Sequence, residues 1–178
     1  MGRFDAMEVD HFRPKRRPEF AHLEHEWANL YYCCRRCNQH KSNHWPTDQE
    51  TQRGLCFVDP CAEDPDEHFQ LCRHPQHDDL CYVMPLTAPA QYTLAKVRLN
   101  RDQLVQIRRS LAAEERKEQE QLREILHLSE CVGADVRDRG SSPETDEMMG
   151  SLEAQRQRCS ARLDVIRSLR PFPLAEQP

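Results

Sequence analysis

Hydrophobic positions in the C-terminal part of the chain recur at the spacing of amphipathic α-helices. One apolar stripe begins at Arg101 and runs to about Glu130, with a charged middle, and a second runs from about Ser151 to Leu169. The stripes consist of Leu104, Ile107, Leu111, Leu122, Ile125 and Leu126, and of Leu152, Cys159, Leu163 and Ile166. We therefore predict an antiparallel helical hairpin over residues 101–178, with a flexible loop near residues 132–150.

The charged stretch from Glu114 to Gln121 has almost no apolar face, so part of it must stand in solvent or meet a polar partner. Two roles for the hairpin follow. It docks a partner protein or a second copy of the chain, which would make a homo-oligomer, or it only covers the core of the preceding module.

Residues 49–100 contain five prolines, which favour turns, short helices and edge strands. The apolar positions of this Pro-rich extension predict one or two short strands. These positions are Val83, Leu86, Tyr92, Leu94 and Val97. With the hairpin, these strands predict an α+β fold.

The amino-acid composition argues against several classes of protein. The 178 residues are 38% hydrophobic and carry a net charge of -5, which predicts a modest core and argues against a globally basic nucleic-acid coat. Residues 1–47 nevertheless hold eight Lys or Arg against six acids. No run approaches the roughly 20 apolar residues of a membrane span, and no signal peptide is evident, so we expect a cytoplasmic protein without a membrane partner.

The nine cysteines are an odd number without a secretory signal, which favours reduced thiols or metal ligands over disulfides. Cys72, His74, His77 and Cys81 lie within ten residues and are either a zinc site or a Cys/His-rich loop. We interpret Cys131 and Cys159 as packing residues on the helical faces.

Three short segments carry the candidate chemistry, and they are Glu8 to Lys15, Trp27 to Leu30, and Cys34 to Lys41. Hydrolysis of a phosphodiester needs an activated water, a cation and donors to the phosphate oxygens. His11 suits the general base, since imidazole accepts a proton near neutral pH. On an extended strand, however, Asp10 and His11 would point to opposite sides.

The ordered set of Asp-His, Asn-Leu and Cys-x-x-Cys-Asn-x-x-Lys resembles the HNH endonucleases. It is most similar to the bacterial group of retron- and Septu-type anti-phage systems. The resemblance implies a small ββα-metal module over residues 1–48, in which Asp10 and Asn38 ligate a cation beside His11. Oxygen ligands favour Mg²⁺ or Mn²⁺. The resemblance also makes Asn29 the residue that orients His11.

Basic residues near this set are candidates for phosphate contacts. Lys41 lies one turn beyond Asn38, and Arg13, Lys15, Arg16 and Arg17 follow His11 closely. The alternative for these four residues after His11 is a solvated basic face. His40 competes as a metal ligand or proton donor but is offset around the helix. Trp27 and Tyr31 are predicted to be core residues rather than platforms for nucleic-acid bases.

Many HNH proteins bind a structural zinc through two Cys-x-x-Cys pairs. Cys34 and Cys37 form one pair, but no cysteine precedes Asp10, so the ligand set for Zn²⁺ is incomplete. Three explanations stay open: the gene starts further upstream and encodes the second pair, the ligands come from elsewhere, with Cys56 and Cys61 as candidates, or the site is vestigial.

We therefore predict a metal-dependent endonuclease acting on DNA. Low sequence specificity is expected because the chain shows no base-reading helix. The resemblance adds a role in anti-phage defence beside an ATPase encoded by a neighbouring gene. The alternative is a non-catalytic nucleic-acid-binding or assembly module that retains the fold.

Overall fold

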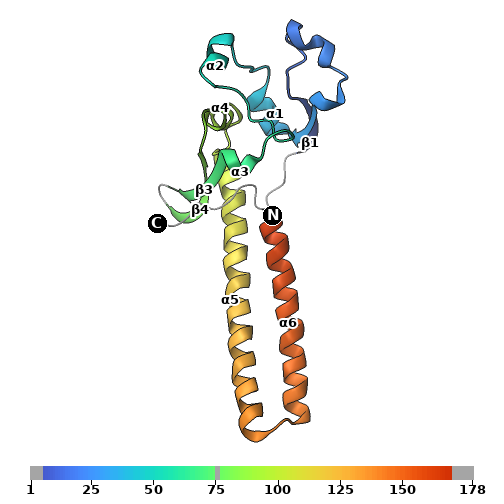
Figure 1. The fold of residues 1–178 in the computed structure, drawn as a ribbon, viewed down its shortest axis with the longest axis vertical. Coiled ribbons are helices and arrows are strands. Elements are labelled where there is room, and N and C mark those ends of the chain that lie inside the picture. Colours follow the sequence, from blue (N-terminus) through green and yellow to red (C-terminus); the bar gives the residue numbers. More distant parts are fainter. Residues whose placement is uncertain (1–5, 75–76, 170–178) are drawn as a thin grey trace. The chain divides into compact units, whose positions relative to one another are not determined.

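The structure is a computed structural model that describes residues 6–74 and 77–169, apart from the side chains of residues 74–80 (Figure 1). It contains two small antiparallel sheets, several short helices and two long C-terminal helices, which confirms the α+β class. The elements are β1 (Met7–His11), η1 (Pro18–Leu23), η2 (Trp27–Asn29), β2 (Leu30–Cys34), α1 (Arg35–Lys41), α2 (Asp48–Gln52), α3 (Pro65–His68), β3 (Phe69–His74), β4 (His77–Pro85), α4 (Ala88–Val97), α5 (Asp102–Arg139) and α6 (Pro143–Ser168).

The chain divides into two compact units, and the division falls within α5. The first unit runs up to Ile107, and the second begins at Arg108. No described helix is long and apolar enough to cross a membrane.

The first unit begins with a β-hairpin followed at once by a short helix. Strands β1 and β2 pair antiparallel, with Met7 opposite Cys34 and His11 opposite Leu30. The switch from strand to helix occurs at Cys34, whose Sγ accepts a hydrogen bond from the backbone N–H of Cys37 and so caps α1. This ββα unit carries all three segments that the sequence marks as chemical.

Aromatic rings support the long loop between β1 and β2. Edge-to-face contacts link Phe12 to Tyr31, Phe12 to Trp45, and Phe20 to Trp45, with ring centroids 5.1 to 5.5 Å apart. Tyr31 thus packs as predicted. The prediction for Trp27 is wrong, because its side chain is 85% exposed at the start of η2 while Trp45 fills the aromatic core.

The Pro-rich extension forms β3, β4 and α4 around a core of Val58, Phe69, Leu71, Val83 and Ala90. Val83 lies in β4, as expected for a strand. The strand prediction is wrong for Tyr92, Leu94 and Val97, which lie in α4. The physical reason is local, since the Thr87 side chain caps the helix at Ala90 N–H and Pro89 fits its first turn.

Helices α5 and α6 form the predicted hairpin, but the predicted flexible loop near 132–150 is wrong. Helix α5 continues to Arg139 and α6 begins at Pro143, so three residues make the connection. Gly140 adopts φ +89°, which ends α5, and Ser142 and Thr145 form a capping box that starts α6. The turn is therefore specified by local chemistry.

The charged middle of α5 meets its polar partner inside the second unit. Glu115 and Glu118 are buried and pair with Arg167 and Arg162 of α6, at N···O distances of 3.3 and 3.1 Å. An apolar cluster of Ile125, Leu152 and Cys159 lies nearer the turn. Cys159 is thus a packing residue as predicted, whereas Cys131 is exposed and that prediction is wrong.

Candidate active site

The ββα unit brings Asp10, His11 and Asn38 to one surface pocket of about 390 Å³. Asp10 and His11 come from the end of β1, and Asn38 from the first turn and a half of α1. The antiparallel pairing of β1 with β2, and the immediate start of α1 after β2, bring these residues together from positions 27 residues apart in the chain. The pocket is lined by polar and basic groups, which include Lys15 and Arg16.

The His11 ring is held by the loop that follows β1. Its Nε2 lies 2.9 Å from the backbone carbonyl oxygen of Glu24. A carbonyl can only accept, so Nε2 carries the proton and donates it to this bond. The other ring nitrogen, Nδ1, is then the unprotonated one and has a lone pair to accept a proton.

Asn29 is buried and fastens that loop to the end of the β-hairpin. Its Oδ1 accepts a hydrogen bond from Arg13 N–H at 2.7 Å, and its Nδ2 donates to the carbonyls of Arg13 and Leu23. Leu23 directly precedes Glu24, whose carbonyl holds His11. The contacts of Asn29 therefore act on the His11 ring through the loop backbone.

Lys41 is buried, and its ammonium group lies beside Asp10. The Nζ atom is 2.9 Å from Asp10 Oδ2 and donates to the carbonyl of His11 at 2.6 Å. Both side chains are poorly exposed, at 8% for Lys41 and 13% for Asp10. Lys41 therefore ties α1 to β1, and the phosphate contact expected for it stays a prediction.

Glu8 is a site residue that the sequence analysis did not select. Its Oε1 accepts a hydrogen bond from Asn38 Nδ2 at 2.9 Å, and its Oε2 lies 3.3 Å from Arg35 Nε. Because the Asn38 amide nitrogen points at Glu8, its Oδ1 faces away from Glu8. The sequence contains a signal for Glu8, because residues two apart on a strand share a face and Glu8 precedes Asp10 by two.

The other basic residues near the site do not all line the pocket of His11. Lys15 lines the pocket and pairs with Glu24 at 2.6 Å, and this hydrogen bond holds the pKa of Glu24 below its usual value. The Arg13 guanidinium stands 6.0 Å from the ring centres of Phe20 and Trp45, and it lines a separate pocket with Asn29. Arg16 lines the same pocket as His11.

A family model matches the region that contains this pocket. Residues 2–44 match the family model described as HNH endonuclease. The chain carries an HNH domain near its N-terminus. The match indicates nuclease activity in general. Comparisons with the curated proteins and with the solved structures give no significant match.

Asp10 and Asn38 line one pocket, where the carboxylate and the amide would be the oxygen donors for a divalent cation. This donor set fits a hard cation that keeps several waters, such as Mg²⁺ or Mn²⁺. His40 is not among the residues lining that pocket, and burial and the charges of Arg98 and Arg101 lower its pKa.

The cysteine pair of the HNH domain has no zinc site around it in the described part of the chain. Cys34 and Cys37 have sulfurs 3.0 Å apart, and the Arg101 guanidinium lies 3.4 and 3.2 Å from them. Burial raises the pKa of Cys37 to about 11. Across the described residues, no three His, Cys, Asp or Glu side chains are grouped as metal ligands. These residues therefore do not fit zinc.

The second predicted zinc cluster, from Cys72 to Cys81, lies partly outside the described residues. Cys81 itself is fully buried.

Proposed function

We propose that this protein is a metal-dependent endonuclease that hydrolyses phosphodiester bonds of DNA. The observation that carries the proposal is the His11 ring, which lines a pocket with Asp10 and Asn38 and is held through Nε2 so that Nδ1 can accept a proton. This is the arrangement that a general base for water needs.

In the proposed reaction, His11 Nδ1 takes a proton from the attacking water. The water oxygen bonds to phosphorus as the P–O bond to the leaving oxygen breaks. Asp10 and Asn38 would hold the cation, which would stabilise the negative charge on the phosphate and on that leaving oxygen. Asn29 keeps the Glu24 carbonyl against the His11 ring, and Lys41 fixes the Asp10 carboxylate. The chain thus supplies the base, the cation ligands and the residues that position them.

Binding of the substrate rests on the basic side chains at the rim of the pocket. Lys15 and Arg16 are exposed and suited to phosphate oxygens, whereas Arg13 faces a neighbouring pocket. Contacts of this kind carry no sequence information, which supports low sequence specificity. The resemblance to retron- and Septu-type nucleases supports a cytoplasmic role in anti-phage defence beside an ATPase.

The proposal is tested with supercoiled plasmid DNA and the purified full chain. Nicked or linear product is expected with Mg²⁺ or Mn²⁺ and none with EDTA. Retarded migration of DNA without cleavage in either cation would instead favour the non-catalytic nucleic-acid-binding module. Absence of both binding and cleavage would contradict both functions.

Glu8 gives a prediction about the cation site. In Glu8→Ala the Asn38 amide loses its acceptor and can rotate, so the Mn²⁺ concentration for half-maximal cleavage is expected to rise about 10-fold or more. The matched variant Glu8→Gln keeps an acceptor oxygen and should lie much closer to the wild type. Equal Mn²⁺ requirements for Glu8→Ala and the wild type would remove Glu8 from the site.

A further inference from the structure

Two cysteines next to the candidate active site lie close enough to form a disulfide bond. Cys34 ends β2 and Cys37 lies in the first turn of α1, and their Sγ atoms are 3.0 Å apart. A disulfide joins sulfur atoms about 2 Å apart, so closing the bond requires a movement of about 1 Å. Both side chains are half-buried, which leaves them accessible to a small reagent.

A fixed positive charge lies against both sulfur atoms. Arg101 Nη2 is 3.4 Å from Cys34 Sγ and 3.2 Å from Cys37 Sγ. The same guanidinium is held at the C-terminal end of α4, because Nη1 donates to the carbonyls of Val97 and Arg98 at 3.3 Å. A cation in this position stabilises a thiolate, which is the reactive form of cysteine, and it repels a metal ion.

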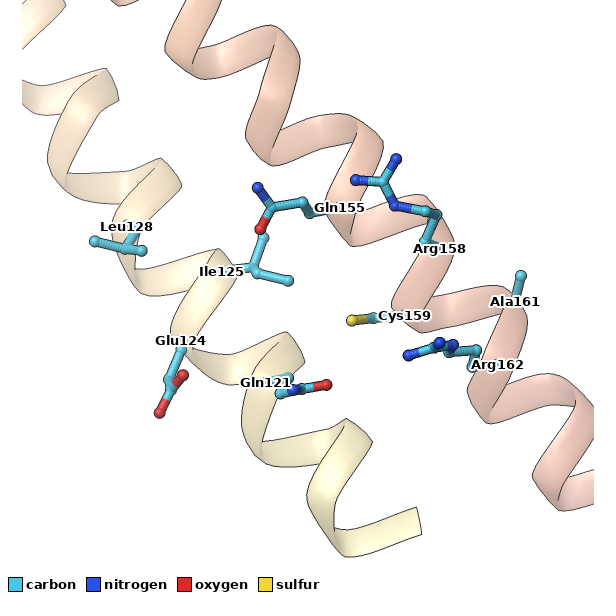
Figure 2. A pocket seen from close by; sticks show the side chains of 9 residues that line it. All are labelled: Gln121, Glu124, Ile125, Leu128, Gln155, Arg158, Cys159, Ala161 and Arg162. Carbon is cyan, nitrogen blue, oxygen red and sulfur yellow. The ribbon is translucent and has the colours of Figure 1, made fainter. Parts of the chain in front are cut away.

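Cys159 shows the contrasting environment of a cysteine that serves packing. It is buried in the second unit, where it points towards Ile125 of α5 (Figure 2). Both residues belong to one apolar cluster with Leu152. A cysteine in such surroundings acts as a small hydrophobic residue. The pair at the start of α1 differs, since each of its sulfurs lies beside a second sulfur and a cation.

We infer that Cys34 and Cys37 form a redox-active dithiol, which a small disulfide such as oxidised glutathione converts into a disulfide bond. One cysteine, as its thiolate, attacks a sulfur of the small disulfide, breaks its S–S bond and expels one thiolate. The other cysteine, as its thiolate, then attacks the protein sulfur of the mixed disulfide and expels the second thiolate. Two electrons pass to the oxidant, and the two cysteine protons end on the two thiols released.

Closure of the disulfide should reach the cation site through α1. The Cys34 Sγ atom accepts the Cys37 N–H that caps α1, and Asn38 directly follows Cys37. Drawing the two sulfurs together alters this first turn, and with it the placement of the Asn38 amide against Glu8. The disulfide form is therefore expected to cleave DNA about 10-fold more slowly than the reduced form. This effect rests on the proposed function, whereas formation of the disulfide does not.

Peptide mapping of the full chain tests the dithiol without any nuclease assay. The reduced protein is incubated with oxidised glutathione in EDTA, blocked with N-ethylmaleimide and digested with trypsin, which cuts after Arg35 and Arg36. The expected product is a disulfide that joins the Cys37 peptide to the peptide ending at Arg35, and dithiothreitol should release it. Because the latter peptide also contains Cys33, the disulfide should survive in Cys33→Ser and be lost in Cys34→Ser. Maleimide adducts on both cysteines of the wild type would overturn the inference.

Zinc and Arg101 provide two further comparisons. The disulfide should form at the same rate when one equivalent of Zn²⁺ replaces EDTA, and protection of both thiols by Zn²⁺ would instead establish a zinc site. Arg101→Gln should slow the reaction with oxidised glutathione about 10-fold, because the thiolate loses its cation. The matched variant Arg101→Lys keeps the charge and should react at a rate closer to that of the wild type. Helix content and melting temperature of both variants serve as the control for folding.

Plasmid cleavage in Mn²⁺ tests the effect of the disulfide on the site. The rate of the oxidised wild type should recover after treatment with dithiothreitol and desalting, and Cys37→Ser should cleave at one rate before and after treatment with oxidised glutathione. Equal rates for the reduced and disulfide forms would exclude the link to the cation site. A reduced protein that cleaves no DNA would contradict the proposed function, and the peptide map would still decide the dithiol.

Discussion

Replacing His11 with alanine is expected to slow DNA cleavage by about 10²- to 10⁴-fold, the usual contribution of a general base. The reason is specific to this site, since His11 Nε2 donates to Glu24 and leaves Nδ1 as the proton acceptor of the pocket. The measurement is single-turnover cleavage of plasmid in saturating Mn²⁺.

The control separates loss of the base from loss of the fold. His22→Ala removes an exposed imidazole from the same loop and should cleave at the wild-type rate. His11→Ala should still bind a labelled DNA duplex in Ca²⁺ and should melt within a few degrees of the wild type. Cleavage by His11→Ala at the wild-type rate would show that another group activates the water.

The buried pair of Asp10 and Lys41 should couple folding stability to cation binding. Asp10→Asn leaves the Lys41 ammonium without its carboxylate and is expected to lower the free energy of unfolding by about 3 kcal/mol. Lys41→Met leaves Asp10 unpaired and should cost a similar amount. The double variant removes both charges and should recover most of that stability, which denaturant unfolding of all four proteins measures.

The affinity for Mn²⁺ should rank the same four proteins in a different order from their stability. Asp10→Asn and the double variant should both bind Mn²⁺ about 10-fold or more weakly, because each lacks the ligand carboxylate. Lys41→Met should bind Mn²⁺ no less tightly than the wild type, since it removes a neighbouring positive charge. Calorimetric titration gives the comparison, and equal affinity in the wild type and Asp10→Asn would exclude Asp10 as a ligand.

Several features of the chain could be predicted from the sequence because they depend on neighbouring residues. The apolar spacing of Leu152, Cys159 and Leu163 predicted a helix that the structure contains as α6. The ordered Asp10-His11, Asn29 and Asn38 set predicted an HNH module, and the family match over residues 2–44 supports it. The helix follows from short-range spacing, whereas the HNH prediction rests on a resemblance carried by three separate segments.

Two predictions differ from the structure at positions where helix-capping residues decide the local fold. Gly140, Ser142 and Pro143 were interpreted as part of a long loop, although together they end one helix and cap the next. Thr87 and Pro89 similarly start α4 where strands were expected. At both places, capping residues start or end a helix in a segment whose composition is typical of loops and strands.

The sequence by itself determined which residues can do chemistry and that the C-terminal part folds into two helices, since both follow from residue type and local spacing. The tertiary structure alone decided what those residues contact. Folding of α1 onto β1 buries Lys41 against Asp10 and sets Glu8 beside Asn38, and the loop path places the Glu24 carbonyl at His11. Each contact joins residues at least 13 positions apart in the chain, so no local pattern of side chains encodes it.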